Sequence, residues 1–198
     1  MMRLFQALGS AATRFKRDSR GVAVVEFALV VPVMLTLYVG AMEASLLITL
    51  DRKVQSVAGA VGDLVARTDG AVSSDQLRDY FQAASGIMTP YPPTDLKQLV
   101  TLIEVADNGA ANVVWSREYA NGVLSIGTTH KVNTTYVLPK EMTLIAQNST
   151  NKFVVASEAM SSYKPLYGFV FDKAIPLYRE NFYTPRSGKT ITTDATVK

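Results

Sequence analysis

Cysteine is absent from the 198-residue sequence, and histidine occurs once, at position 130. Without cysteine the chain has no disulfide, no thiol nucleophile and no thiolate ligand for a metal. A single histidine also excludes a metal site built on two histidines. An oxidising compartment stays open but is not indicated. We therefore expect no metal site and no cofactor.

Excess charge of one sign is confined to the amino terminus. Residues 1–20 contain five basic residues and one acid, whereas the rest of the chain has 15 basic and 16 acidic residues. Nucleic-acid-binding proteins gather Lys and Arg on a folded face, and the body of this chain has no such excess. The sequence therefore predicts no nucleic-acid partner.

The apolar residues are just as unevenly distributed. Residues 22–50 include 22 apolar residues in 29, and the 16 residues between Glu26 and Glu43 carry no charge. At about 1.5 Å per residue, a helix over residues 22–50 is long enough to cross a bilayer core of about 30 Å. Basic residues gather before this segment and not after it, so the positive-inside rule places the amino terminus in the cytoplasm. We expect a single-pass membrane protein.

A basic tail followed by an apolar segment has three interpretations. A secretory signal peptide needs a shorter apolar core and a small-x-small cleavage site, which residues 42–44 match poorly. An uncleaved anchor fits the hydropathy, but it gives no reason for Glu26 at the cytoplasmic edge. An acid well inside a membrane costs about 2.5–3.5 kcal/mol, and less near an end, so Glu26 needs a partner.

The third interpretation supplies that partner. Residues 20–27, Arg-Gly-Val-Ala-Val-Val-Glu-Phe, resemble the processing site of type IV pilin-like precursors. In that family a prepilin peptidase cuts after the glycine, and an acid stands at the fifth position of the mature chain. Gly21 and Glu26 match both positions, so the resemblance implies a cut before Val22. It also implies that Glu26 pairs with the new amino group of Val22, usually on a neighbouring subunit, and such a pair costs less in lipid than a lone acid.

The resemblance becomes narrower over residues 21–33. Phe27 follows the acid directly, and Pro32 stands six residues after it. This segment looks like the opening of TadE- and TadF-like minor pilins, or pseudopilins, of the tight-adherence (Tad, Flp) pilus system. In that family such a proline marks where the stem helix bends or unwinds, although membrane helices also tolerate an ordinary proline kink. Residues 153–166 are similar to the ending of TadE-type chains.

The resemblance implies a non-enzymatic minor pilin that helps to initiate or assemble the Flp pilus for surface adhesion. Its implied partners are the major Flp pilin, other minor pilins, the prepilin peptidase, the inner-membrane Tad assembly platform and membrane lipid. The stem would lie in the bacterial inner membrane with a periplasmic head, or in the pilus. The rival hypothesis is an uncleaved single-pass membrane protein with a periplasmic binding or sensor domain. An enzyme ranks third, because no catalytic constellation is recognisable.

The fold class predicted for the chain is α+β and type IV pilin-like. Apolar residues at helical spacing, from Val54 to Val65, extend the membrane helix as an amphipathic one, and residues 68–70 end it. The predicted organisation is a basic prepilin leader (1–21), a transmembrane helix (22–50), an amphipathic extension (51–69), an α+β periplasmic head (70–186) and a loose polar tail (187–198).

The head is predicted to open with a short helix and continue as a sheet. Ser73 and Gln76 have the spacing of a capping box. Antiparallel strands, about three to five in all, are indicated by β-forming runs separated by Asn-Gly turns. The predicted strands cover residues 99–105, 112–119, 123–126 and 152–160.

Two further features of the head have competing interpretations. His130 lies beside Lys131 in a polar stretch, so we expect it to be solvated. An aromatic cluster either packs in the core, which we favour, or forms an exposed strip for subunit contact. Its members are Tyr163, Tyr167, Phe169, Phe171, Tyr178, Phe182 and Tyr183.

Overall fold

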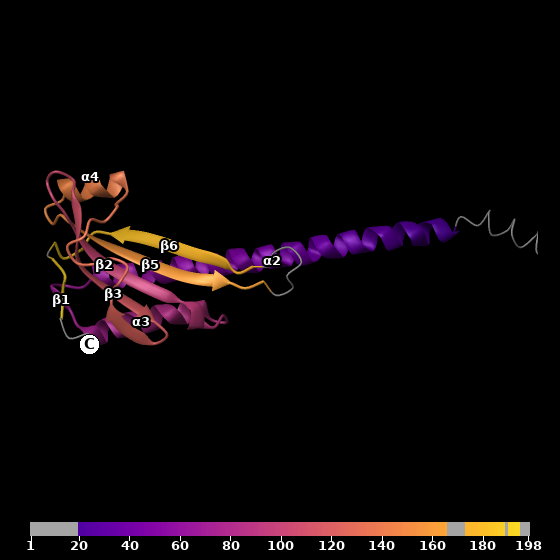
Figure 1. Ribbon diagram of the computed structural model, residues 1–198, viewed down its shortest axis with the longest axis horizontal. Coiled ribbons are helices and arrows are strands. Elements are labelled where there is room, and N and C mark those ends of the chain that lie inside the picture. The colour runs from indigo at the N-terminus through magenta and orange to yellow at the C-terminus, as the bar shows by residue number, and fades with distance from the viewer. Residues whose placement is uncertain (1–19, 166–172, 189, 195–198) are drawn as a thin grey trace, which may run out of the picture. The chain divides into compact units, whose positions relative to one another are not determined.

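The computed structural model describes residues 20–165, 173–188 and 190–194 (Figure 1). The chain divides into two units, Met1–Ser45 and Leu46–Lys198, and one helix, α2 (Arg20–Ala66), contributes to both. Of the predicted aromatic cluster, Tyr167, Phe169 and Phe171 lie outside the described residues.

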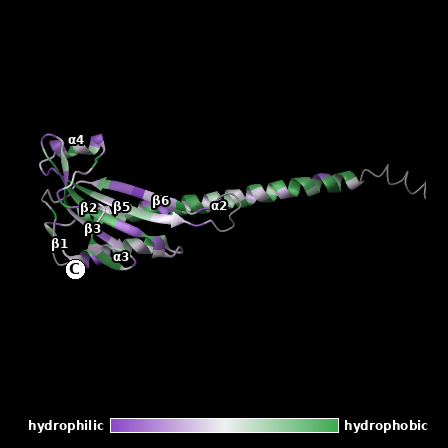
Figure 2. Cartoon of the chain, in the orientation of Figure 1, coloured by the Kyte–Doolittle hydropathy of each residue, from purple (hydrophilic) through white to green (hydrophobic). Residues whose placement is uncertain are grey.

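The first unit is described from Arg20 and consists of the amino-terminal part of α2. Its large apolar side chains from Val22 to Tyr38 are 55–71% exposed, except for the half-buried Val31. Figure 2 shows the run of hydrophobic residues along this helix. The helix continues through Pro32, and the Thr36 hydroxyl donates to the Pro32 carbonyl at 2.8 Å. The segment Gly21–Ala66 is long and apolar enough to cross a membrane.

The second unit begins with residues 46–66 of α2 and continues as a small α+β head. Its helices are α3 (Ser74–Ser85) and α4 (Lys140–Asn148), with short 3₁₀ turns at Gly86–Met88 and Pro93–Asp95. The main sheet contains β2 (Lys97–Val105), β3 (Ala111–Ala120), β4 (Val123–Ile126), β5 (Phe153–Tyr163) and β6 (Ile175–Tyr183). These five strands are antiparallel, in the order β4-β3-β2-β5-β6. The structure thus confirms the predicted fold class.

One face of the sheet packs against α2 and α3. Val54, Val57, Val61 and Val65 of α2 are fully buried, as the helical spacing predicts. They share a core with Leu77 and Phe81 of α3, and with Trp115 and Val155 of the sheet. Burial of a valine side chain contributes about 1.5–3 kcal/mol. This apolar contact between α2 and the sheet, which we call the helix–sheet seam, therefore holds the carboxyl-terminal part of α2 on the head.

The opposite face of the sheet has a second, smaller core. It consists of Ile103, Val105, Ala111, Val113, Val154 and Ala156 from the strands, together with Tyr136 and Ala146. Ala146 belongs to α4, and Tyr136 belongs to the segment between β4 and α4, residues 127–139, which we call the crossing loop. The head therefore has three layers, with the sheet in the middle.

Local signals in the sequence account for several element ends. Asn121 and Gly122 both have positive φ, 52° and 80°, as a two-residue type I′ hairpin turn between β3 and β4 requires. Ser73 caps α3 by accepting a hydrogen bond from the Gln76 N–H at 3.2 Å. The Gln76 side chain donates to the Tyr80 hydroxyl instead of returning to Ser73, so only half of the predicted capping box forms.

The prediction of a loose tail is wrong for residues 190–194, which we call the carboxyl-terminal strap. Ile191 is fully buried, and its carbonyl accepts a hydrogen bond from Trp115 Nε1 at 2.7 Å. Next to it, β7 (Thr192–Thr193) pairs in parallel with β1 (Ala71–Val72). A single apolar residue among polar ones has no periodicity, so only the tertiary fold shows that it is buried.

The two longest elements of the head that were not predicted from the sequence are α4 and β6. The edge strand β6 contains Pro176, which is tolerated there because an edge strand needs fewer ladder hydrogen bonds. On this strand Tyr178 is exposed, whereas Phe182 and Tyr183 pack against the cores. Tyr163 is also buried, so the described members of the aromatic cluster mostly support the core interpretation.

Gly62 of α2 gives a test of the helix–sheet seam. A Cβ at this position would lie 2.6 Å from Tyr183 Cδ2 and 2.9 Å from Ser157 Cβ, so Gly62→Ala overpacks the seam. We expect the variant to lose about 1–3 kcal/mol of unfolding free energy, even though alanine favours a helix. Thermal unfolding of the full chain in detergent measures the change. The matched control is Gly86→Ala, where a Cβ would meet nothing within 4 Å, and an equal loss there would contradict the prediction.

Candidate functional site

The residues of the predicted processing motif lie together at the start of α2. The helix begins at Arg20, so Gly21 and Val22 belong to its first turn. Val22 and Glu26 are four residues apart, which places their side chains one helical turn from each other on one face. Glu26 is exposed, and Phe27 is 71% exposed. The motif is therefore accessible, with its acid set in an apolar surface.

Gly21 has no packing reason to be glycine in the described structure. A Cβ built on it would meet nothing within 4 Å, and it lacks the positive φ that some glycines of this chain have. Glycine inside a helix costs about 1 kcal/mol relative to alanine. The described fold thus gains no stability from glycine at position 21. Recognition by another molecule is an alternative reason for this residue.

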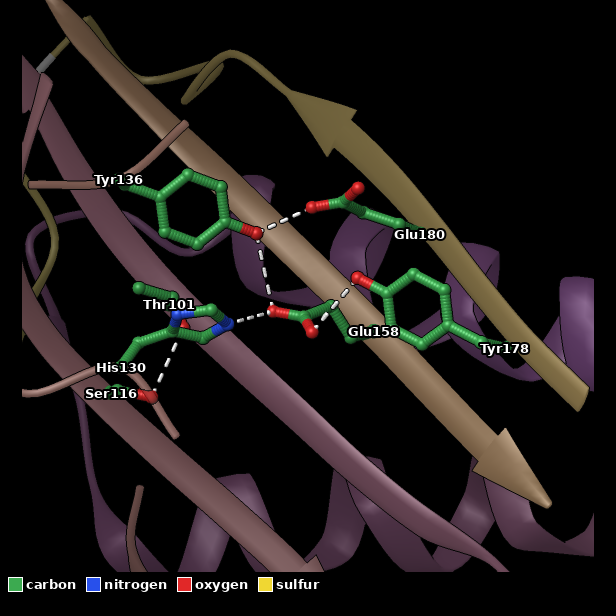
Figure 3. A network of polar contacts seen from close by, with 7 residues as sticks. All are labelled: Thr101, Ser116, His130, Tyr136, Glu158, Tyr178 and Glu180. Atoms are coloured by element: carbon green, nitrogen blue, oxygen red, sulfur yellow. Dashed lines mark hydrogen bonds and ion pairs between the residues drawn. The ribbon is translucent and has the colours of Figure 1, made fainter. Parts of the chain in front are cut away.

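A second cluster of polar residues surrounds Glu158 in the head. Glu158 stands on β5 and is 2% exposed. It lies on the same face of β5 as Ala156 and Val154, the face of the second core. Figure 3 shows side chains from the crossing loop and from β6 converging on its carboxylate. Nothing in the sequence pointed to this cluster, because its members come from segments distant along the chain.

The prediction that His130 is solvated is wrong. His130 Nε2 lies 2.6 Å from Glu158 Oε1, and its side chain is 25% exposed. Its ring also packs against Tyr136, with the ring centroids 4.6 Å apart. A polar neighbourhood in the sequence does not show where a loop lies, and the crossing loop places His130 over the sheet.

Two tyrosines donate hydrogen bonds to the carboxylates of this cluster. The Tyr178 hydroxyl donates to Glu158 Oε2 at 3.0 Å. The Tyr136 hydroxyl lies 2.5 Å from Glu180 Oε1 and 3.2 Å from Glu158 Oε1. Burial, reinforced by the adjacent carboxylates, raises the pKa of both tyrosines, so they stay protonated donors.

Glu158 and Glu180 are directly opposed across β5 and β6. Like charges in this position repel each other. Burial raises the pKa of Glu180, and the hydrogen bond from Tyr136 partly offsets that rise. The shared hydroxyl of Tyr136, together with the contacts of His130 and Tyr178 to Glu158, therefore offsets this repulsion.

A second contact fixes the crossing loop at its first residue. The Gly127 N–H donates to the Ser116 carbonyl at 3.0 Å. A Cβ at Gly127 would lie 2.8 Å from Ser116 Cβ, so the backbone of the loop fits closely over β3 only without a side chain. The Ser116 hydroxyl in turn bonds Thr101 on β2 at 3.0 Å (Figure 3).

The contacts of the cluster join separate segments of the head. Among the described residues no group of three or more His, Asp or Glu side chains is placed to hold a metal ion. The cavities described in the head are lined by other residues. The cluster ties the crossing loop to β5 and β6 through charged hydrogen bonds in a buried place.

Tyr136→Phe tests the cluster. The variant keeps the ring but removes the donor shared by two carboxylates, and a hydrogen bond to a charged group contributes about 1.5–3 kcal/mol. We expect a loss of that size in the unfolding free energy, measured by denaturant titration of the full chain in detergent. The matched control, Tyr178→Phe, removes one bond at a residue that is 47% exposed, and it should cost less. Equal losses in the two variants would contradict the assignment.

Comparison with known proteins bears on the stem. The family model described as TadE-like protein matches residues 21–62. Neither a curated protein nor a solved structure matches the chain. The matched segment starts at Gly21 and includes Glu26, Phe27 and Pro32, which confirms the resemblance noted for residues 21–33. Over residues 21–62 the chain is therefore similar to the TadE-like family.

Proposed function

We propose that the chain is a minor pilin, or pseudopilin, of the Tad (Flp) pilus, made as a precursor and cut by a prepilin peptidase between Gly21 and Val22. The observation that carries the proposal is the TadE-like match, which begins at Gly21. The open space around Gly21 supports it, because a glycine that the fold does not need is available for recognition by a peptidase.

The stem supports insertion in a membrane. Its apolar side chains are exposed over about four turns of α2, and an exposed apolar helix needs lipid or other subunits around it. With the basic tail in the cytoplasm, the head lies in the periplasm and the stem spans the bacterial inner membrane. Transfer of the same surface from lipid to neighbouring pilin stems would accompany assembly.

Glu26 has a defined part in this proposal. After the cut, the amino group of Val22 carries a positive charge one helical turn from an acid in apolar surroundings. Pairing between Glu26 of one subunit and this amino group of another removes two uncompensated charges from lipid. Such a pair would set the axial register between subunits.

The proposed partners follow from this role. They are the prepilin peptidase, the major Flp pilin, other minor pilins and the inner-membrane Tad assembly platform. The protein acts by assembly for surface adhesion, without catalysis by its head, without a cofactor and without nucleic acid.

Gly21→Ala tests the processing step. We expect the wild-type protein from its native host to begin at Val22, and the variant to lose the processed form, because a methyl group stands at the residue before the cut. Amino-terminal sequencing measures this. Since a Cβ at Gly21 meets nothing within 4 Å, the fold should not change.

The control for this test is Gly86→Ala in the head, which should be processed normally. A variant Gly21→Ala that still begins at Val22 would refute the processing site. A wild-type protein that begins at Met1 would favour the rival hypothesis, an uncleaved anchor with a binding or sensor domain.

Glu26→Gln tests the assembly step. Glutamine keeps the shape of the side chain and removes its charge, so the protein should remain in the membrane fraction while the yield of sheared pili falls. Glu141→Gln, on the exposed first turn of α4, is the matched control and should leave the yield unchanged. Normal pilus yield with Glu26→Gln would exclude the proposed charge pairing.

A further inference from the structure

The head contains a cavity between α2, the 3₁₀ turns and the end of β5. Its volume is about 280 Å³, and it is partly open to solvent. Cavities that hold small molecules are typically about 300–1,000 Å³ and mostly apolar. This one lies close to the lower end of that range, which suits a narrow ligand.

The cavity has apolar walls and a charged rim. Leu50, Met88 and Tyr163 line it, and each is at most 5% exposed. Asp95 and Lys164 also line it and form an ion pair of 2.8 Å, with side chains 43% and 71% exposed. An exposed ion pair contributes little to stability, so both charges can turn to a ligand at low cost.

The position of the cavity along the chain indicates what fills it. Leu46 and Leu50 line the cavity and belong to the last five residues of the predicted membrane span, 22–50. At the end of such a span, Tyr and Lys side chains typically mark the boundary between lipid and water. The exposed Lys164 is of this kind, so the cavity lies where the stem would emerge from the bilayer.

We propose that this cavity holds an acyl chain of one phospholipid from the leaflet that faces the head. The headgroup phosphate lies on Lys164, and the ammonium of an ethanolamine headgroup lies on Asp95. The complementarity has two parts, an apolar interior for the chain and a rim with one charge of each sign for a zwitterionic headgroup. The inference rests on the proposed insertion of residues 22–50 in the membrane.

Photolabelling of the full chain in vesicles tests the inference. The vesicles contain phosphatidylethanolamine and phosphatidylglycerol, with a trace of phosphatidylethanolamine that has a diazirine near the end of one acyl chain. After irradiation, adducts are mapped by mass spectrometry. We expect one set on residues 27–42 of the stem and a second set on Met88 and Tyr163 in the cavity.

The two sets of adducts separate this inference from the proposed function. Adducts on the stem without adducts in the cavity would overturn the lipid site and leave membrane insertion standing. A stem without adducts would overturn the proposed insertion, and the inference with it.

A filling variant sharpens the test. Ser161 lines the cavity on β5, and Ser161→Phe should reduce cavity labelling to background while stem labelling stays unchanged. The control is Ser125→Phe on β4, a half-buried serine outside the lining, which should keep cavity labelling. Persistent cavity labelling in Ser161→Phe would overturn the proposal.

Lys164→Glu tests the rim without disturbing the core, because the Lys164 side chain is 71% exposed. The reversed charge repels the phosphate, so labelling of Met88 should fall. Lys140→Glu, at an exposed residue of α4, serves as the control and should not change it. Unchanged labelling of Met88 in Lys164→Glu would overturn the headgroup assignment.

Discussion

The close contact between α2 and the sheet is the constraint on which the head depends. At Gly62 the helix has no side chain, and Tyr183 of β6 and Ser157 of β5 take that space. The Tyr183 hydroxyl then reaches the Gly59 carbonyl at 3.1 Å, which fixes the edge strand to the helix. Because α2 also supplies the valines of the main core, one helix is both the stem of the protein and the central support of its head.

The two faces of the sheet are stabilised in different ways. The face toward α2 is held by apolar burial and by the close fit at Gly62. The other face holds the crossing loop through Glu158, Tyr136 and His130, where each partner must be present because a buried carboxylate without donors is costly. The second face therefore depends on polar partners, and the first supplies most of the apolar burial.

The sequence predicted the elements whose signals are local. The valine spacing of α2, the Asn121-Gly122 turn and the Ser73 cap each depend on residues within a few positions of one another, and each appears in the structure. β6 was not predicted, since Pro176 and its charged residues hide the alternation of an edge strand. The buried strap at Ile191 and the position of His130 were predicted wrongly, because both depend on segments far away in the chain.

The sequence by itself determined the stem motif, the apolar segment and the α+β class, and the TadE-like match agrees with it. These features are read along the chain, since a short motif, an apolar segment and an amphipathic helix are each defined by neighbouring residues. Only the tertiary structure shows the buried cluster around Glu158 and the cavity between α2, the 3₁₀ turns and the end of β5. Strand register sets Glu158 beside Glu180, and the packing of α2 against the end of β5 encloses the cavity. No periodicity encodes these distances, because they arise from contacts between residues that are far apart in sequence.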